Sequence, residues 1–364
     1  MTPWFWINTP AQLLPWLQRD VASICIDTEF IRENTYWPDL ALVQIAIDTD
    51  ILLIDVQSDG MKEALCPWLL APHITKIMHS AREDIIALQH ACDATPFPLF
   101  DTQIAAAFLG LGVGLSYQKL VTQITGVVLD KQHTRSAWQQ RPLTRAQMQY
   151  AADDVRYLGE IYQNLHERLI ASQRIDWFYE DCAQLAASEN NDGELKPRDL
   201  AQALRFLDSN AQQRFFRLMR WRQTYALESN MPRNWVLDVG LATLLARTPP
   251  ENSEALHQHL ASFPRTPGYL AHQIWEILNT PLSKEAHTMM TFVDLHTPCY
   301  QRALKQMQTI VSTTSKTVGL PESLLASRRH LEAFIQQRRW PKALGTWRQQ
   351  LLESQLSACL PAET

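Results

Sequence analysis

The stretch CIDTEF at residues 25–30 places two carboxylates, Asp27 and Glu29, directly after an apolar run. That run, SICI at 23–26, is typical of a buried strand. Side chains two residues apart on a strand point to the same face, so both acids share one side of the sheet. Two desolvated acids so close together repel each other unless a cation lies between them. The chain must therefore fold so that a cation, with the groups that hold it, reaches this strand end.

Strand and helix patterns alternate through the first 170 residues. Apolar runs predict strands at 22–28, 41–47, 51–56 and 76–79. Helices are predicted at 102–110 and 116–124, and a further one runs from Ser80 to Cys92, where Ser80 and Glu83 have the spacing of a capping box. The clearest helical pattern covers 145–169, with Thr144 and Gln147 as a second capping box. Strands interleaved with helices indicate an α/β domain over residues 1–170.

The second half of the chain reads differently. Residues 186–198, AASENNDGELKPR, are small and polar and predict a linker. Beyond it helical patterns dominate, and two similar phrases, NWVLDVGLATLLARTPPENSEAL and SKTVGLPESLLASRRHLEAFI, begin at 234 and 315. We therefore predict two small helical bundles, at 208–287 and 292–364, joined to the first domain by a connecting helix and linker at 171–207.

Composition limits the class of protein. No apolar run is long enough for a transmembrane helix, and the N-terminus lacks the basic region of a signal peptide. The six cysteines are scattered without a CxxC pair, which is typical of free thiols in a reducing cytoplasm and disfavours a structural zinc site. Net charge is −5, with the acidic excess in residues 1–200 and a basic excess in 201–364. Either the acidic half holds metals and the basic half contacts phosphates, or the composition is simply uneven.

Further polar residues must be weighed with the two acids. Asp84 falls in the first turn of the helix predicted after Ser80, where an acid also complements the helix dipole. Tyr150 and Asp154 are four residues apart in a helical pattern and so share a side. Taken alone, such a pair is better explained as a packed tyrosine and a solvated acid. Asp101, which opens DTQIAAAFLG, is better interpreted as a helix cap.

Together and in this order, the residues resemble the motifs of the DEDD exonuclease superfamily. Gln149 stands where one subgroup has histidine, so the tyrosine subgroup fits. DTEFIRENTYWPDLALVQIAI, MHSAREDIIAL and DKQHTRSAWQQRPLTRAQMQYAADDVRYL resemble the three motif blocks of the ribonuclease D family, with Ala81 and Arg82 where glycines are usual. The two C-terminal phrases resemble the HRDC domain, a helical nucleic-acid-binding module also found in RecQ-type helicases.

The resemblance implies a fold and a metal site. The expected fold is a ribonuclease-H-like exonuclease domain with a mixed sheet flanked by helices, followed by two small helical HRDC-like bundles. Four acids would hold two divalent cations, and ligands without His or Cys favour Mg²⁺ or Mn²⁺. Asp27 would bridge both cations, with Glu29 and Asp154 on the first and Asp84 reached partly through water. Tyr150 would orient the attacking water, since a free tyrosine pKa of about 10 makes it a poor base.

The implied activity is a 3′–5′ exoribonuclease that trims the 3′ ends of tRNA precursors and releases 5′-mononucleotides. It would act as a cytoplasmic monomer on RNA, without a membrane or an obligate protein partner. Thr28, Phe30, His79, Trp138 and Arg141 are candidate substrate contacts, although a structural role is favoured for the last three. Two alternatives stay open: a DNA-directed 3′–5′ exonuclease, and a non-catalytic RNA-binding protein, which the intact set of five residues disfavours. No GxxxxGK[ST] motif is present, so helicase activity is not expected.

Overall fold

The computed structural model describes residues 4–129, 136–187, 200, 203–204, 207–281 and 297–361. Most of the predicted linker, Lys131 of the third motif block and the outer ends of the two predicted bundles lie outside these residues. Within the part of the chain that is described, no helix has the length and apolar character needed to cross a membrane.

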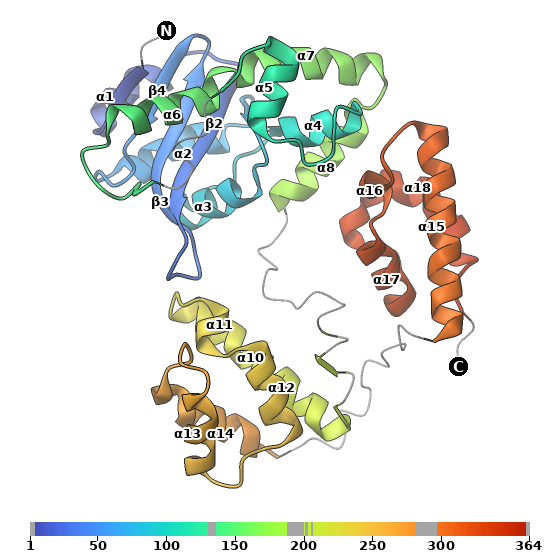
Figure 1. Cartoon of the computed structure of the whole chain (residues 1–364). Coiled ribbons are helices and arrows are strands. Elements are labelled where there is room, and N and C mark those ends of the chain that lie inside the picture. The colour runs from blue at the N-terminus through green and yellow to red at the C-terminus, as the bar shows by residue number, and fades with distance from the viewer. Residues whose placement is uncertain are drawn as a thin grey trace.

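One mixed sheet organises the N-terminal part of the chain (Figure 1). Its strands are β1 (Trp4–Ile7), β2 (Ser23–Ile31), β3 (Asp39–Ile47), β4 (Asp50–Ile54), β5 (Thr75–Met78) and β6 (Leu99–Asp101), in the spatial order β1-β4-β3-β2-β5-β6. The pairs β2–β3 and β3–β4 are antiparallel, and the other three pairs are parallel. The four predicted strands all form. The sequence predicts neither β1 nor β6, because four and three residues carry too little periodicity.

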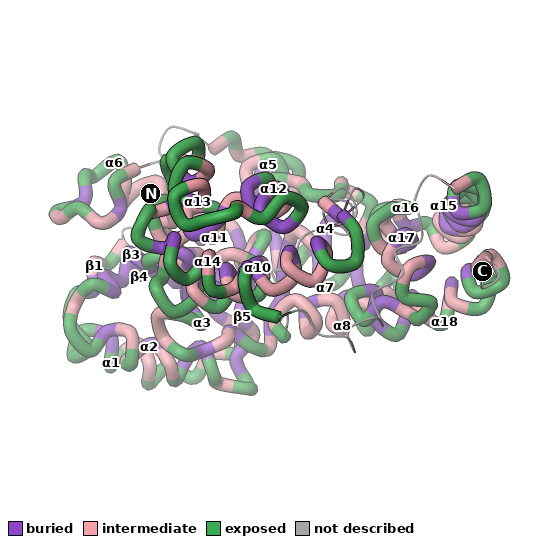
Figure 2. The backbone as a smooth tube through the Cα atoms, turned by 90° about the horizontal axis from the view of Figure 1, so that it is seen from below, coloured by how far each residue is buried: buried purple, intermediate pink, exposed green. Residues whose placement is uncertain are grey.

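Helices cover both faces of this sheet. They are α1 (Pro10–Leu17), α2 (Met61–Leu70), α3 (Arg82–Cys92), α4 (Thr102–Phe108), α5 (Tyr117–Thr125), α6 (Arg145–Arg156), α7 (Leu158–Ala171) and α8 (Ile175–Ala187). Gly159 of α7 packs against Cys25, so α6 and α7 lie over the face of β2 that also carries Asp27. Thr28 points to the opposite face and bonds Asp84 of α3. Figure 2 shows the buried residues along the strands and the inward sides of these helices.

The helix predicted over 145–169 is in fact two helices. The Thr144–Gln147 capping box is confirmed at the start of α6. Tyr157 then interrupts the helix at φ −102° and ψ −4°, and α7 begins at the next residue. The Tyr117 hydroxyl lies between the Asp153 carbonyl and the Tyr157 amide, which would otherwise bond each other. A side chain inserted into the helical ladder is a known cause of such a bend.

Two helical units follow. The first has α10 (Ser209–Glu228), α11 (Arg233–Val236), α12 (Val239–Arg247), α13 (Ser253–Ala261), η2 (Gly268–Leu270) and α14 (Ala271–Asn279). The second has α15 (Pro298–Val318), α16 (Glu322–Leu325), α17 (Arg328–Gln337), η4 (Lys342–Leu344) and α18 (Gly345–Ser357). The short α11 and α16 both follow a proline and end at closely similar backbone angles, φ −159° and −156°. Apart from α13, the order of elements is shared, in agreement with the repeat in the sequence.

Each helical unit contacts the N-terminal α/β domain at a different place. The tip of the β2–β3 hairpin reaches the first unit (Figure 1), where Tyr36 is buried in that unit's own core. The Tyr36 amide donates to the Asn230 carbonyl at 3.1 Å, and Gln223 donates to the Tyr36 hydroxyl at 2.9 Å. The second unit packs on α8, where Trp347 stacks on Trp177 with ring centroids 4.7 Å apart. Its buried residues belong to the same continuous hydrophobic cluster as the sheet.

Candidate active site

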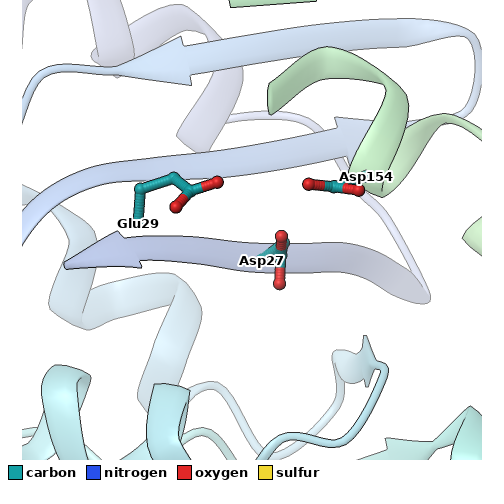
Figure 3. Close-up of side chains that lie close together, drawn as sticks. All are labelled: Asp27, Glu29 and Asp154. Carbon is teal, nitrogen blue, oxygen red and sulfur yellow. The ribbon is translucent and has the colours of Figure 1, made fainter. Parts of the chain in front are cut away.

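Three carboxylates converge where β2 passes under α6. One oxygen each from Asp27, Glu29 and Asp154 lies within 4.8 Å of the other two. Figure 3 shows Glu29 and Asp154 pointing toward each other beside Asp27. The Tyr150 hydroxyl donates a hydrogen bond to the Asp154 carboxylate one helical turn away. The structure therefore brings Tyr150 and three of the four predicted acids into one group.

The charges in this group are poorly compensated. Desolvation, and then the carboxylates of Asp84, Asp154 and Glu29, hold the pKa of Asp27 well above its ordinary value. Desolvation followed by Asp154 and Asp84 raises the pKa of Glu29 to about 9. Burial also raises the pKa of Asp154 to about 7, against the opposing effect of the Tyr150 hydrogen bond. Oxygen-only donors carrying excess negative charge are what Mg²⁺ or Mn²⁺ requires, so the residues present suit a divalent cation.

Asp84 lies beside the group of three and is not one of its members. Its Oδ1 accepts a hydrogen bond from the Thr28 hydroxyl. Desolvation raises its pKa to about 7, although the Thr28 bond opposes the shift. Its charge still acts on Asp27. Thr28 thus orients one of the predicted acids through its side chain.

The predicted capping box at Ser80 is wrong. Ser80 has a left-handed backbone with φ 59°, and α3 begins two residues later without a side-chain cap. The Asp101 carboxylate accepts from the amides of Ser80 and Ala81 at 3.2 and 2.8 Å. It also caps α4, as predicted, by accepting from Gln103 and Ile104. One buried acid therefore fixes both the turn before Asp84 and the start of the next helix.

A pocket of about 310 Å³ opens beside the acids. Its walls come from the acid group, the β5–α3 turn and the start of α5: Asp27, His79, Ser80, Gln103, Ser116, Tyr117, Gln118, Tyr150, Asp154 and Leu158. His79 lines it but is held internally, because its Nε2 donates to the Leu115 carbonyl at 3.0 Å and its Nδ1 bonds Thr102 at 2.9 Å. Burial lowers the His79 pKa, so the ring stays neutral.

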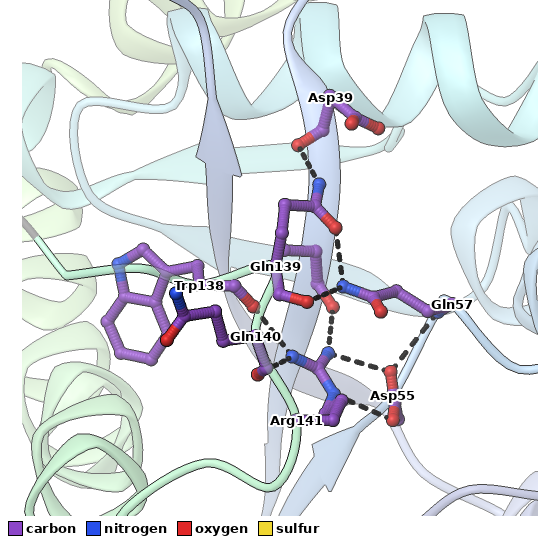
Figure 4. Close-up of polar contacts among 8 residues, drawn as sticks. Asp39, Asp55, Gln57, Trp138, Gln139, Gln140 and Arg141 are labelled. Atoms are coloured by element: carbon purple, nitrogen blue, oxygen red, sulfur yellow. Dashed lines mark hydrogen bonds and ion pairs between the residues drawn. The ribbon is translucent and has the colours of Figure 1, made fainter.

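Three other predicted contacts, Phe30, Trp138 and Arg141, are not among the residues that line this pocket. Phe30 is partly buried, and the Trp138 ring is buried 6.1 Å from that of Tyr150. Arg141 is engaged within the protein (Figure 4): it donates to both oxygens of Asp55 at 2.9 and 2.7 Å and to the carbonyls of Trp138 and Ala41. Arg141 thus fixes the loop that carries Trp138 over the sheet.

Sequence reasoning missed two polar residues at this site. Gln44 is fully buried directly opposite Asp27 in the β2–β3 ladder, and neither of its amide atoms has a hydrogen-bond partner. Its position in the run ALVQIAI predicted a strand but did not indicate that the side chain lies buried opposite Asp27. Tyr117 contacts the α6–α7 junction from α5, and only the three-dimensional fold reveals that contact.

Comparisons with known proteins agree with this architecture. A family model described as "3'-5' exonuclease" matches residues 4–170, and one described as "Ribonuclease D, C-terminal HRDC domain" matches 298–356. Ribonuclease D from Xanthomonas oryzae pv. oryzae is 49% identical over 98% of each chain. Ribonuclease D from a Shewanella strain is 30% identical over 92% of this chain and 88% of its own. The crystal structure of Escherichia coli RNase D aligns with a TM-score of 0.86, at 28% identity over 98% of each chain.

The mixed sheet, its covering helices and the matching family model define a 3′–5′ exonuclease with a C-terminal HRDC domain. With a curated relative at 49% identity over nearly the whole length, the chain belongs to the ribonuclease D family. It is a 3′–5′ exoribonuclease.

Proposed function

We propose that Asp27, Glu29, Asp84 and Asp154 hold two divalent cations, Mg²⁺ or Mn²⁺, at which phosphodiester bonds are hydrolysed from the RNA 3′ end. The observation that carries the proposal is the approach of three carboxylate oxygens to within 4.8 Å of one another beside an open pocket. Cations bound there would lower the pKa of the attacking water and stabilise charge on the departing 3′ oxygen. Neutralising the acids would also remove the repulsion that raises their pKa values.

Tyr150 has a positioning role in this proposal. Desolvation, and then the charges of Asp154, Glu29 and Asp27, raise its pKa above that of a free tyrosine. The hydroxyl therefore stays protonated at neutral pH and cannot serve as the base. It can donate to Asp154 and accept from a water, so it orients the nucleophile.

Asp84 would add negative charge to the cation site from a carboxylate that is held in place. The Thr28 hydroxyl and the Asp84 amide orient this carboxylate, which would bond a water held between the acids. Thr28 and Asp101 would then act together, since one orients the Asp84 carboxylate and the other fixes the preceding turn. The predicted substrate contacts stay proposals: Thr28, Phe30, His79, Trp138 and Arg141. The internal bonds of His79 and Arg141 favour a supporting role for both.

The natural substrates would be tRNA precursors, whose 3′ extensions are trimmed with release of 5′-mononucleotides. The curated relatives named ribonuclease D support an RNA substrate. The two helical units, proposed here as HRDC-like bundles at 208–287 and 292–364, would hold structured RNA while its 3′ end enters the pocket. Free cysteines throughout the described chain suit a reducing cytoplasm, and we propose that the protein acts there as a monomer.

A time course on a 3′-extended tRNA tests the proposal, with a DNA oligonucleotide of matched sequence alongside. Stepwise shortening of the RNA with release of 5′-mononucleotides, abolished by EDTA and restored by Mg²⁺ or Mn²⁺, is expected. Equal or faster degradation of the DNA would favour the DNA-directed alternative. RNA binding without any shortening would favour the non-catalytic one.

A further inference from the structure

Tyr117 occupies an unusual place at the junction of α6 and α7. Its hydroxyl donates to the Asp153 carbonyl at 3.0 Å and accepts from the Tyr157 amide at 3.3 Å. These two backbone groups are the donor and acceptor that pair in an uninterrupted helix. The tyrosine therefore replaces one helical hydrogen bond with two bonds to its own side chain. The chain changes direction there, and α5 packs against α7 beside the junction (Figure 1).

The interruption falls next to a proposed metal ligand. Asp154 follows Asp153 directly and lies in the last turn of α6, three residues before the break. Tyr117 is only 7% exposed, and its ring forms a wall of the same pocket as Asp27, Tyr150 and Asp154. Burial raises the pKa of its hydroxyl, and the charges of Asp154 and Asp27 raise it further. The hydroxyl is therefore protonated at neutral pH and can donate to the Asp153 carbonyl.

Asp153 is also held through its side chain. Gln149 donates to one of its carboxylate oxygens at 2.9 Å, and Arg156 donates to the other at 2.7 Å. With its carbonyl bonded to Tyr117, this residue is fixed at both the backbone and the side chain. The Asp153 carbonyl belongs to the peptide that joins Asp153 to Asp154. Because this peptide is fixed, it also determines the direction in which the Asp154 carboxylate points.

We propose that Tyr117 is a positioning residue of the exonuclease: its hydroxyl maintains the α6–α7 break that directs Asp154 toward Asp27 and Glu29. This inference rests on the proposed function of those acids. Without the hydroxyl, the Asp153 carbonyl and the Tyr157 amide would either bond each other, or the carbonyl would lose its partner while the amide kept only its bond to the Val155 carbonyl. In the first case the end of α6 straightens and turns Asp154 away, and in the second the junction becomes mobile.

The variant Tyr117→Phe tests this in the full-length protein, because it removes one oxygen and keeps the ring. We expect kcat on a single-stranded RNA oligonucleotide to fall about ten- to a hundred-fold, as for small misplacements of catalytic groups. The KM for RNA should change less than about twofold, since no proposed RNA contact is lost. The Mg²⁺ concentration for half-maximal activity should rise. Without RNA, the increase in thermal midpoint on adding Mg²⁺ should shrink.

Tyr162→Phe is the matched control. Tyr162 lies on α7 with its ring against Phe100, at 4.7 Å between centroids, and loses the same single atom. It should retain kcat and the Mg²⁺ response. Hydrogen exchange at residues 153–158 should change in Tyr117→Phe, becoming slower if α6 straightens and faster if the junction becomes mobile, and should stay as in wild type in Tyr162→Phe.

Two results would overturn the inference. One is a Tyr117→Phe enzyme with wild-type kcat and a wild-type Mg²⁺-induced increase in thermal midpoint. The other is a variant whose metal-free protein is less stable while kcat and the Mg²⁺ response are unchanged, which would assign Tyr117 to folding alone. Asp27→Asn separates this inference from the proposed site. If Asp27→Asn stays active, the site assignment itself fails. If it is inactive while Tyr117→Phe behaves as wild type, only the role of Tyr117 fails.

Discussion

Arg348 and Asp181 form a bidentate ion pair although they are 167 residues apart in the sequence. Two guanidinium nitrogens each donate to a different carboxylate oxygen, both at 2.6 Å. The two side chains are 7% and 10% exposed, so the pair is shielded from water. It joins α18 of the second helical unit to α8 of the exonuclease domain, next to the stacked Trp177 and Trp347.

Asp181→Asn should therefore destabilise the protein strongly. Removing one partner leaves a buried charge without compensation, which costs about 3–5 kcal/mol. Urea denaturation of the full chain measures the loss in free energy of unfolding. Asp50→Asn is the control, because its pair with Arg19 is exposed and worth at most about 1 kcal/mol. Equal effects of the two substitutions would show that the buried pair does not secure the second unit.

The acid group predicts an unusual pH dependence of stability. The pKa is raised in the fold to about 9 for Glu29 and to about 7 for Asp154 and the neighbouring Asp84, against about 4 when unfolded. Between about pH 4 and pH 9, the folded chain therefore binds more protons at these carboxyls than the unfolded chain does. The free energy of unfolding of the metal-free protein should therefore fall as the pH rises from about 5 to 9. Thermal melts in EDTA measure it, and Mg²⁺ should reverse the loss at high pH.

The substitution Asp27→Asn should have opposite effects on stability and on activity at the same site. The substitution removes one of the repelling charges, so the metal-free protein should melt at a higher temperature than wild type at pH 8. Activity should disappear, and the Mg²⁺-induced increase in thermal midpoint should largely vanish. Asp59→Asn, at an exposed acid, should change none of these quantities. A fully active Asp27→Asn enzyme would contradict the assignment of the metal site.

Tyr150→Phe should reduce kcat about ten- to a hundred-fold while leaving RNA binding and the Mg²⁺ response nearly intact. The ring, which lies 6.1 Å from that of Trp138, is retained, and only the hydroxyl that orients water is lost. Single-turnover cleavage of a 3′-labelled RNA measures the chemical step. An unchanged rate would rule out water positioning by Tyr150.

His330 makes the stability of the second helical unit depend on pH at the start of α17. It completes the capping box with Ser327, and burial, followed by the charges of Arg348 and Arg329, lowers its pKa to about 4. The neutral ring contributes stability above about pH 6.5, and that stability is lost as the pH falls toward 4. Glutamine can complete the same capping box without titrating. Thermal melts from pH 7.5 to 4.5 should therefore show a smaller decline for His330→Gln, and parallel curves would refute the role.

The order of the motif residues was sufficient to predict the acid group. Asp27 and Glu29 share a strand face, and Tyr150 and Asp154 share a helix side, so local periodicity places each pair correctly. The family resemblance supplied what periodicity could not, namely that the two pairs meet. The capping box of Thr144 and Gln147 was also predicted correctly, because it involves only residues close together in the sequence.

The wrong predictions all involve a partner distant in the sequence. Ser80 has the local signature of a helix cap, but Asp101 supplies the hydrogen bonds from the end of β6 and leaves Ser80 in a left-handed turn. The pattern over 145–169 is continuous in the sequence, but the Tyr117 hydroxyl interrupts its backbone ladder from α5. Tyr36 gave no signal of its burial in the first helical unit, because the residues around it there come from 200 and beyond.

The two ends of the described chain contribute to one hydrophobic core, while residues 204–278 form a separate core with Tyr36. The first helical unit is thus inserted between two segments, 4–187 and 298–356, that together form the larger core. A truncation after residue 187 would remove the stacking partner of Trp177 and leave this larger core incomplete. Replacing residues 204–281 by a flexible linker, with a polar residue in place of Tyr36, would leave the larger core intact. Modular engineering of this enzyme should therefore exchange the middle of the chain and keep its C-terminus.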